Sequence, residues 1–289
     1  MNRPSLILLC GIPGSGKSTY AHNYIQSSPT HTMHLSSDSI RKELYGNESI
    51  QGNPSEVFTL MQERAVEALN NGNDVLYDAT NITRKDRASI ITACPKFTKI
   101  ECHIIWTPIE MCIERDANRE RTVGKGVIDR MLKRFPYYDE GIDEILIIKP
   151  EGFNVAEYTQ KCFNDMHISH DNPHHTKDIY HHCESAHRYL FDNNVFGDLA
   201  IAALMHDIGK PYTKAFRDTK GNPCESAHYY QHQCTGSWLS YGTTWGNPYV
   251  GWLISTHMEP YFNSKYYRSL APYLKRDIDI LHKADVESH

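Results

Sequence analysis

The chain has 289 residues, enough for two domains at roughly 150 residues each. Hydrophobic residues make up 40% and charged residues 22%, an ordinary globular composition that argues against a disordered or fibrous protein. The formal net charge of −5 gives no global positive field, so any contact with nucleic acid has to come from a local basic patch.

The cysteines and the apolar runs bear on the cellular compartment. The eight cysteines form no C-x-x-C pair and have no regular spacing, so we expect reduced thiols. The run Leu6–Cys10 is too short for a signal peptide, and no stretch approaches the ~18 apolar residues of a membrane-spanning helix. The sequence predicts a soluble, cytoplasmic protein without membrane contact.

In the first 150 residues, short apolar runs alternate with amphipathic stretches. The expected strands are Leu6–Cys10, Thr32–Leu35, Asp74–Tyr77, Ile100–Trp106 and Ile145–Ile148. The expected helices are Lys17–Ile25, Ser55–Leu69, Lys85–Ile91, Ile109–Arg119 and Val127–Phe135. Alternating strands and helices predict an α/β domain, a parallel sheet with helices on both faces.

Histidine usage divides the chain, because thirteen of the 17 histidines lie after residue 160. In that part we expect no strands and an all-α domain. Its expected helices are Thr176–Phe191, Leu199–Met205, Gln231–Leu239, Trp252–His257 and Ile278–Val286. The polar stretch 165–175 is expected to be a loop, and Pro150–Gly152 a hinge. The predicted domains are therefore residues 1–150 and 151–289.

The first motif is the glycine-rich loop Gly11–Ser18, a complete G-x-x-x-x-G-K-[ST] pattern between an expected strand and helix. Backbone N–H groups of such a loop and of the following helix surround nucleotide phosphates. Lys17 would reach the β- and γ-phosphates, and Ser18 would hold Mg²⁺. The alternative is a glycine-rich turn without a ligand. The predicted residues for binding ATP, or another nucleoside triphosphate, are Gly11, Gly14, Ser15, Gly16, Lys17, Ser18, Thr19 and Arg115.

Asp38 and Arg41 follow the second expected strand, at the sheet edge where ligands bind in open α/β sheets. They are three residues apart, so a helix starting there puts both on one face. A carboxylate that accepts a hydroxyl proton beside a guanidinium that holds a phosphate suits a phosphorylated alcohol acceptor. Equally, Asp38 could only cap the helix while Arg41 pairs with a nearby acid. Asp78, after the third strand, suits a magnesium shell or a turn.

Residues 115 to 134 contain seven basic and three acidic side chains. Such a run is usually a solvated face, but phosphoryl-transfer enzymes carry an arginine-bearing lid at this place. Arg115 and Arg119, four residues apart, could both face the γ-phosphate.

Four segments of this half, GIPGSGKST, SSDSIR, YDATNITRKDR and IERDANRER, resemble the P-loop polynucleotide 5′-hydroxyl kinases of bacteriophage and RNA-repair systems. The resemblance covers about residues 5 to 135. It implies that Lys17 and Ser18 are the Walker A pair and that Asp38 is the general base. Arg41 would contact the phosphate of the acceptor, and Arg119 would be the lid arginine that stabilises the transition state.

The second motif is the vicinal pair His206-Asp207 in an apolar expected helix. Buried polar groups need partners, and a divalent metal ion suits an imidazole beside a carboxylate. Any single histidine is more often a core or surface residue than a ligand. The candidates that complete the metal shell are His182, His232, His257 and Asp285.

The second half resembles the HD phosphohydrolase superfamily. The segment 172–182 looks like the entry of HD domains attached to tRNA nucleotidyltransferases, and 203–211 matches the HD core. The resemblance implies one metal held by His182, His206, Asp207 and Asp285, with His232 and His257 on a second. One or two divalent transition metals (Mn, Co, Ni or Zn) are expected. Lys210 could contact the scissile phosphate, or be only a cation at a helix end.

A kinase fused to an HD phosphohydrolase resembles the end-healing enzymes of RNA repair. It would phosphorylate 5′-OH ends of RNA, or DNA, and open and remove 2′,3′-cyclic phosphates, so that a ligase can act next. A homo-oligomer is left open, and in a phage-encoded protein the compartment is the host cytoplasm. Two alternatives remain: a small-molecule kinase fused to an HD nucleotidase, and a nucleotide-switched binding module. Asp38 argues against the module, because a switch needs no acceptor base.

Overall fold

The computed structural model describes residues 3–28, 32–135, 141–172 and 176–288. The chain divides into two compact units. The first comprises Met1–Met131 and Asp139–Glu151, and the second comprises Leu132–Tyr138 and Gly152–His289. Among the described residues, no helix has the length and apolar character needed to cross a membrane.

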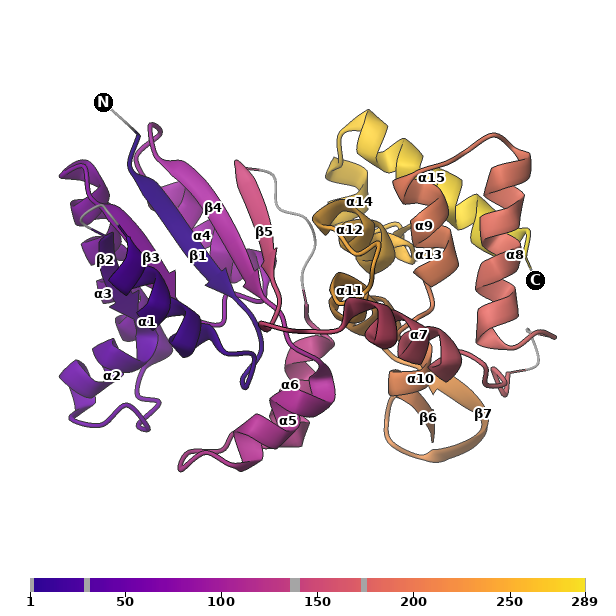
Figure 1. The fold of residues 1–289 in the computed structure, drawn as a ribbon, viewed down its shortest axis with the longest axis horizontal. Coiled ribbons are helices and arrows are strands. Elements are labelled where there is room, and N and C mark those ends of the chain that lie inside the picture. Colours follow the sequence, from indigo (N-terminus) through magenta and orange to yellow (C-terminus); the bar gives the residue numbers. More distant parts are fainter. Residues whose placement is uncertain (1–2, 29–31, 136–140, 173–175, 289) are drawn as a thin grey trace. The chain divides into compact units, whose positions relative to one another are not determined.

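The first unit contains a parallel sheet of five strands in the order β2-β3-β1-β4-β5 (Figure 1). The strands are β1 Ser5–Cys10, β2 Thr32–Ser36, β3 Asp74–Asp78, β4 Lys99–Ile105 and β5 Glu144–Ile148. All five predicted strands are confirmed, with ends that shift by one residue or less. The central strand, β1, lies between β3 and β4 and is buried on both faces, which explains its uninterrupted apolar sequence.

Helices cover both faces of this sheet, as predicted. The helices of this unit are α1 Lys17–Ser27, α2 Ser37–Tyr45, α3 Pro54–Asn70, α4 Arg84–Ala93, α5 Ile109–Ala117 and α6 Lys125–Leu132, and the first four contribute to the cores on the two faces. Side chains alternate along a strand, so Leu6 and Leu8 of β1 join one core with Val57 and Met61 of α3. The intervening Ile7 and Leu9 join a second core, which contains Ala21 of α1.

The second unit is mainly helical. Its helices are α7 Val155–Asp165, α8 Ile179–Asp192, α9 Asp198–Met205, α10 Lys210–Thr213, α11 His232–Tyr241, α12 Pro248–Thr256, α13 Glu259–Phe262, α14 Lys265–Ser269 and α15 Pro272–Val286. The five predicted helices are all present, and α7 and the short helices α10, α13 and α14 were not predicted. Every residue of α11 is buried, because this helix runs through the core. Phe135, from the short N-terminal segment of this unit, packs edge-on against Trp238, with ring centroids 4.9 Å apart.

The prediction that strands are absent after residue 160 is wrong. β6 Lys214–Arg217 and β7 Pro223–Tyr229 form an antiparallel hairpin (Figure 1). Asp218 closes its turn by accepting hydrogen bonds from the backbone N–H groups of Lys220 and Asn222, each at 2.8 Å. Most residues of both strands are half-buried or exposed, so they lack the apolar runs on which the other strands were predicted.

Candidate functional site

The glycine-rich loop joins β1 to α1. Gly14 has a φ of +81°, and a Cβ there would collide with the backbone carbonyl of Cys112, so only glycine fits. Gly16, with a φ of +98°, precedes α1 and provides no side-chain cap, and the first turn of α1 contains no acidic residue. The first N–H groups of α1 therefore have no side-chain acceptor at the N-cap, which suits an anion such as a phosphate.

Lys17 lies at this loop, and its Nζ donates to the carbonyl oxygens of Gly11 at 2.8 Å and Ile12 at 3.0 Å. Burial lowers the pKa of the Lys17 ammonium, and the carboxylate of Asp78 opposes that shift. Ser18 and Thr19 are exposed at the start of α1, whereas Ser15 is buried.

Asp78 ends β3, beside β1 on one side and β2 on the other. Its Oδ2 lies 3.2 Å from Nε2 of His34. Because the charge of Asp78 acts on Lys17, this carboxylate belongs to the same site as the loop. A carboxylate and a serine hydroxyl are oxygen ligands, which Mg²⁺ prefers, so Asp78 and Ser18 fit the magnesium ion that a P-loop binds with ATP.

Asp38 and Arg41 lie together on α2, as their spacing predicts. Ser36, not Asp38, caps this helix by accepting from the N–H of Ser39. Arg41 Nη1 is 2.6 Å from Asp38 Oδ1, and Arg121 Nη1 is 3.7 Å from the same oxygen. Asp38 remains about half exposed. The result is an accessible carboxylate between two guanidinium groups, at the sheet edge that carries the nucleotide loop.

The segment predicted as an arginine-bearing lid contacts the glycine-rich loop. Arg115, on α5, places Nη1 at 3.4 Å from the carbonyl oxygen of Gly14. α5 ends at Ala117, so Arg119 lies outside the helix to which it was assigned. Its positive charge nevertheless contributes to lowering the pKa of Lys17. Both arginines therefore act on the nucleotide loop.

Sequence reasoning missed Asp116, which organises the lid. Its side chain is buried and lies 3.6 Å from Arg119 Nη2. It also accepts hydrogen bonds from the backbone N–H groups of Val123 at 3.1 Å and Gly124 at 2.8 Å. The available signal was an acid between the two arginines Arg115 and Arg119 of a strongly basic run. This carboxylate fixes residues 119–124 by bonding to both ends of the turn.

In the second unit, the six predicted metal ligands converge. His182 comes from α8, His206-Asp207 directly follow α9, His232 begins α11, His257 directly follows α12 and Asp285 lies on α15. All six are at most 7% exposed. Two overlapping sets of ligand atoms lie within 4.8 Å of one another: His182 with His206 and Asp207, and Asp207 with His232 and His257. We call these six residues the buried cluster.

Asp207 stands at the centre of the buried cluster. Its Oδ1 is 3.1 Å from His232 Nε2 and 4.0 Å from His257 Nε2. Its Oδ2 is 3.4 Å from His206 Nε2 and 3.8 Å from His182 Nε2. Asp285 Oδ1 adds contacts of 2.9 Å to His182 and 3.3 Å to His206. One carboxylate thus joins two imidazole pairs.

Three of the imidazoles are oriented by their own backbone. Nδ1 of His206 lies 2.8 Å from the carbonyl oxygen of Ala203, and Nδ1 of His257 lies 2.7 Å from that of Ile254. His232 makes the same contact with a carbonyl three residues earlier, at 2.9 Å. A carbonyl can only accept, so Nδ1 carries the proton and Nε2 has the lone pair when the ring is neutral.

The pairing of the Nε2 atoms tests whether the buried cluster fits metal ions. His206 Nε2 is 3.3 Å from His182 Nε2, and His232 Nε2 is 3.2 Å from His257 Nε2. Burial lowers the pKa of His257 to about 3, assisted by the charges of neighbouring histidines, so this ring is neutral. Nitrogen lone pairs that face each other at this distance repel unless a proton or a metal cation lies between them. Burial lowers the pKa of His206, but Cys183 and the carboxylates of Asp207 and Asp285 outweigh that effect and raise it well above its usual value. The donor set of imidazoles and carboxylates fits divalent transition metals.

Lys210 lies in α10, a helix of four residues, and is the basic residue of its last turn. Its Nζ is 2.6 Å from Asp207 Oδ2, and its contact with a scissile phosphate stays a prediction. Burial raises the pKa of Asp207, but the charges of Lys210 and His206 outweigh that effect and hold it well below its usual value. Asp207 is therefore an anion, as a ligand carboxylate has to be.

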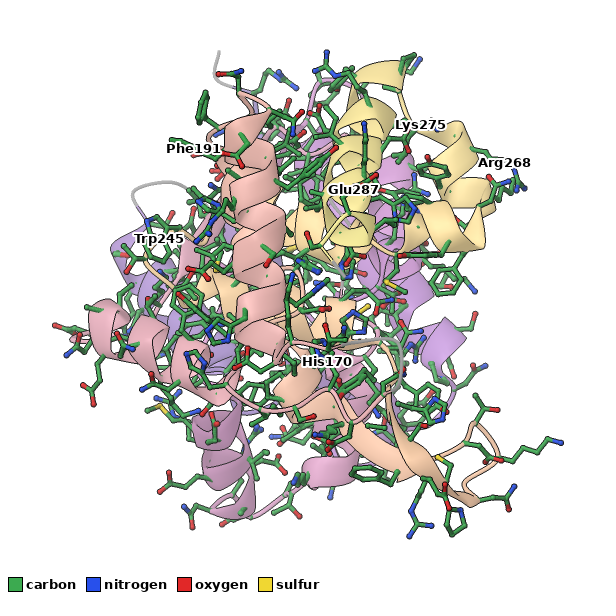
Figure 2. All side chains as sticks on the ribbon, turned by 90° about the vertical axis from the view of Figure 1, so that its right-hand side faces the viewer. His170, Phe191, Trp245, Arg268, Lys275 and Glu287 are labelled. Atoms are coloured by element: carbon green, nitrogen blue, oxygen red, sulfur yellow. The ribbon has the colours of Figure 1, made fainter. Side chains whose placement is uncertain are left out.

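His170 was not predicted as a site residue, because it stands in a polar stretch without a recognisable pattern. It is buried, its ring lies 5.7 Å from that of His182, and its Nδ1 is 2.9 Å from the carbonyl oxygen of Lys177. A hydrogen bond from His170 also helps to lower the pKa of Asp207. Figure 2 labels this residue beside the N-terminal end of α8. His170 is therefore not one of the proposed metal ligands, but it packs against His182 and helps to keep Asp207 ionised.

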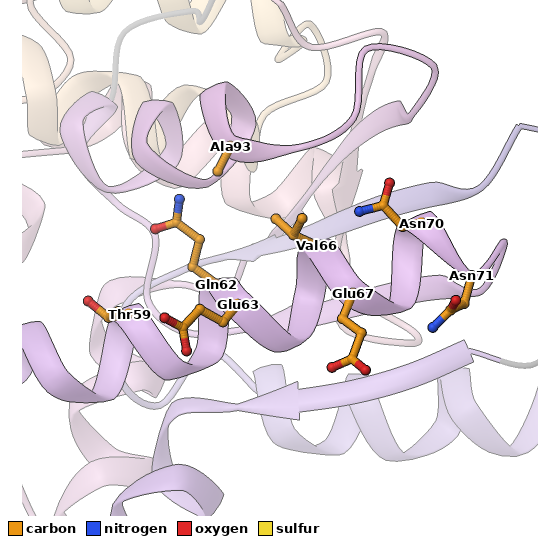
Figure 3. Close-up of a pocket in the computed structure, with 8 residues that line it drawn as sticks. All are labelled: Thr59, Gln62, Glu63, Val66, Glu67, Asn70, Asn71 and Ala93. Carbon is orange, nitrogen blue, oxygen red and sulfur yellow. The ribbon is translucent and has the colours of Figure 1, made fainter.

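A hollow lies away from both of these residue groups. An open depression of about 820 Å³ runs along the outer side of α3, with Ala93 of α4 at its edge (Figure 3). Glu63, Glu67 and side-chain amides line it, and none of its lining residues is a lysine, arginine or histidine. Its acidic side chains do not suit a phosphate ligand. Its lining residues belong neither to the nucleotide site nor to the buried cluster.

Residues 6–137 match the model of an AAA domain family. A curated relative, "Transcription factor bHLH140" of Arabidopsis thaliana, is 25% identical over 150 residues, which are 49% of this chain and 15% of the relative. The chain thus spans only a small part of that relative's length.

Solved structures show distant likenesses. A chain of the Pnkp1/Rnl/Hen1 RNA repair complex has a TM-score of 0.43 at 21% identity, covering 46% of this chain and 44% of that one. A gluconokinase from Sinorhizobium meliloti has a TM-score of 0.35 at 15% identity, covering 52% and 84%. The APS kinase CysC of Mycobacterium tuberculosis has 0.38 at 18%, covering 57% and 98%. The stretch that matches the AAA domain family, residues 6–137, includes the glycine-rich nucleotide loop and the Asp38 helix.

Proposed function

We propose that this protein prepares RNA ends for ligation with two separate sites. The first unit transfers the γ-phosphate of ATP to a 5′-hydroxyl end, and the second hydrolyses a 2′,3′-cyclic or 3′-phosphate end. We take residues 1–150 and 151–289 as the corresponding domains. The observation that carries the proposal is the presence of a nucleotide loop in one unit and of imidazole nitrogens that face each other around Asp207 in the other.

In the kinase site, Asp38 accepts the proton of the acceptor hydroxyl. The hydroxyl oxygen then bonds to the γ-phosphorus, the bond to the β–γ bridging oxygen breaks, and ADP leaves. Lys17, Arg115 and Arg119 stabilise the negative charge of the transferring group. Mg²⁺, held by Ser18 with Asp78, neutralises charge on the phosphates when it is bound.

A polynucleotide acceptor is favoured by the surroundings of Asp38. Arg41 and Arg121 both approach this carboxylate, so two cations are available for phosphates of the acceptor itself. A nucleoside offers no such phosphate. Further lysines and arginines of residues 121–134 would extend the positive surface along a chain of phosphates.

In the phosphohydrolase site, His182, His206, Asp207 and Asp285 would hold one divalent ion, and Asp207, His232 and His257 a second. Such ions supply a nucleophilic hydroxide and stabilise charge on phosphate oxygens. Asp207 fixes the two sets of ligands relative to each other, and Lys210 and His170 keep Asp207 ionised. The two reactions would leave a 5′-phosphate and a 3′-hydroxyl, the ends that a ligase joins.

The direct test uses γ-labelled ATP with four acceptors side by side: a 5′-OH RNA oligonucleotide, a 5′-OH DNA oligonucleotide, a nucleoside 3′-monophosphate and a nucleoside. We expect label on the oligonucleotides, much less on the monophosphate and none on the nucleoside. Equal labelling of the nucleoside would instead support a small-molecule kinase, and a protein that binds ATP without labelling any acceptor would support a nucleotide-switched binding module.

The metal preference of the second site is a separate prediction. Metal-stripped protein should regain hydrolysis of cyclic or terminal phosphates with Mn²⁺, Co²⁺, Ni²⁺ or Zn²⁺ and not with Mg²⁺ alone, because an imidazole-rich site disfavours a hard ion that prefers oxygen. The measurement is product formation from an RNA with a 2′,3′-cyclic end at matched ion concentrations. Full activity with Mg²⁺ as the only ion would contradict the assignment of four histidines as ligands.

A further inference from the structure

A second group of metal-binding residue types lies outside the buried cluster. His167, Asp178 and His181 place nitrogen and oxygen atoms within 4.8 Å of one another. Nδ1 of His181 is 2.7 Å from Asp178 Oδ1, and Nδ1 of His167 is 3.3 Å from Asp178 Oδ2. Two imidazoles thus approach the two oxygens of one carboxylate. The side chains of His167 and His181 are about half exposed, so an ion from solution can reach them.

The backbone holds the two segments that carry these residues. An isolated antiparallel bridge pairs Ser169 with Asp178. Two further hydrogen bonds join the same two segments. The N–H of Ile179 donates to the carbonyl oxygen of Ile168 at 3.2 Å, and the N–H of Tyr180 donates to that of Met166 at 3.1 Å. These bonds fasten the chain after α7 to the first turn of α8. The backbone hydrogen bonds therefore hold the three side chains near one another, in addition to the contacts between the side chains themselves.

Side-chain packing adds to this preorganisation. The ring of Tyr180 lies 4.4 Å from that of His167, and the rings of His167 and His181 are 5.5 Å apart. A ring packed in this way loses less freedom when it binds an ion. The 3.3 Å between His167 Nδ1 and Asp178 Oδ2 is also close to the distance between neighbouring ligands around a tetrahedral ion, roughly 3.3 Å for bonds of about 2.0 Å. The 2.7 Å between His181 Nδ1 and Asp178 Oδ1 is a hydrogen-bond length, so His181 has to move slightly to bind the ion.

Helix capping explains only part of this arrangement. Asp178 caps α8, because its Oδ1 accepts the N–H of His181 at 2.7 Å. A cap needs one carboxylate oxygen, whereas here the second oxygen faces His167, from a different segment. A carboxylate oxygen that accepts an N–H keeps a lone pair for another partner, so capping and metal binding are compatible.

We propose that His167, Asp178 and His181 bind a divalent transition metal ion, with Zn²⁺ as the best match, and that water completes its shell. Two imidazoles and a carboxylate form a ligand set that Zn²⁺ accepts. The ion ties the chain after α7 to the start of α8, one residue before His182 of the buried cluster. This is a structural metal site, and it does not depend on the proposed reactions.

The test counts ions on the full-length protein. Metal-stripped wild type and variants are dialysed to equilibrium against Zn²⁺, and bound zinc is measured by elemental analysis. We expect His167→Ala and Asp178→Asn each to bind about one ion per chain less than wild type. Asparagine caps helices as well as aspartate does, so Asp178→Asn keeps α8 while it loses the charged ligand. His22→Ala, a change at an exposed histidine on α1, is the matched control and should bind as many ions as wild type.

Thermal unfolding provides a second measurement that does not rely on counting. Without metal, Asp178→Asn and wild type should unfold at the same temperature, and Zn²⁺ should raise that temperature more for wild type than for the variant. If either His167→Ala or Asp178→Asn retains the wild-type number of ions, the three residues are a capping network and the proposed site does not exist. Neither result bears on the kinase or the phosphohydrolase, whose substrates are absent from the experiment.

Discussion

Lys17→Ala is expected to lower phosphoryl transfer from ATP to a 5′-OH oligonucleotide by on the order of a thousand-fold or more, and to leave hydrolysis of a 2′,3′-cyclic end unchanged. The ammonium of Lys17 lies at the nucleotide loop, where it would bind the β- and γ-phosphates of ATP. No residue of the buried cluster belongs to the first unit, so its reaction should be independent. The measurement is the labelling rate with γ-labelled ATP, with hydrolysis followed in the same preparation.

Two further variants locate the acceptor side and the lid. Asp38→Ala and Arg119→Ala should also abolish transfer, because they remove the proposed base and a charge that stabilises the transition state. Lys42→Ala, at an exposed lysine on the same helix as Asp38, is the control and should transfer phosphate at the wild-type rate. Near-wild-type transfer by Asp38→Ala would mean that this carboxylate only pairs with Arg41.

The double variant His206→Ala with Asp207→Ala is expected to eliminate hydrolysis of the cyclic end while 5′-phosphorylation continues. Asp207 contacts four imidazoles, two on α8 and α11 and two directly after α9 and α12, so its loss removes a ligand from both proposed ions. The readout is the end chemistry of an RNA that carries both a 5′-OH and a 2′,3′-cyclic phosphate. We expect a 5′-phosphate to form while the cyclic end persists.

Folding has to be separated from chemistry in this experiment, because metal binding can itself stabilise a domain. Asp207→Asn keeps the volume of the side chain and removes only its charge, so it should lose hydrolysis with less effect on packing. His187→Ala, on the same helix as His182 but bonded to the carbonyl of Ala200, is the control and should remain active. Opening of the cyclic end at the wild-type rate by the double variant would exclude the buried cluster as the hydrolytic site.

The sequence predicted best those features whose burial requires a recognisable pattern of residues. Leu6–Leu9 are apolar because β1 is covered on both faces, and His206-Asp207 stand out because polar groups in an apolar helix need a specific partner. The hairpin β6–β7 was missed for the opposite reason, since its half-exposed strands are under no such constraint. Asp116 and His170 were missed because their roles depend on hydrogen bonds to residues that are distant from any motif.

The backbone bonds of His206 and His257 have a consequence for stability. Each Nδ1 binds a carbonyl in the last turn of the preceding helix, α9 or α12, where carbonyls lack partners within the helix. The same hydrogen bond thus pairs a carbonyl at the helix end and orients Nε2 toward Asp207. Fraying of either helix end would release a ligand, and loss of that ligand would leave a carbonyl unpaired. Ion occupancy and local opening of these helix ends are therefore linked equilibria, so the exchange of their amide hydrogens should report whether the ions are bound.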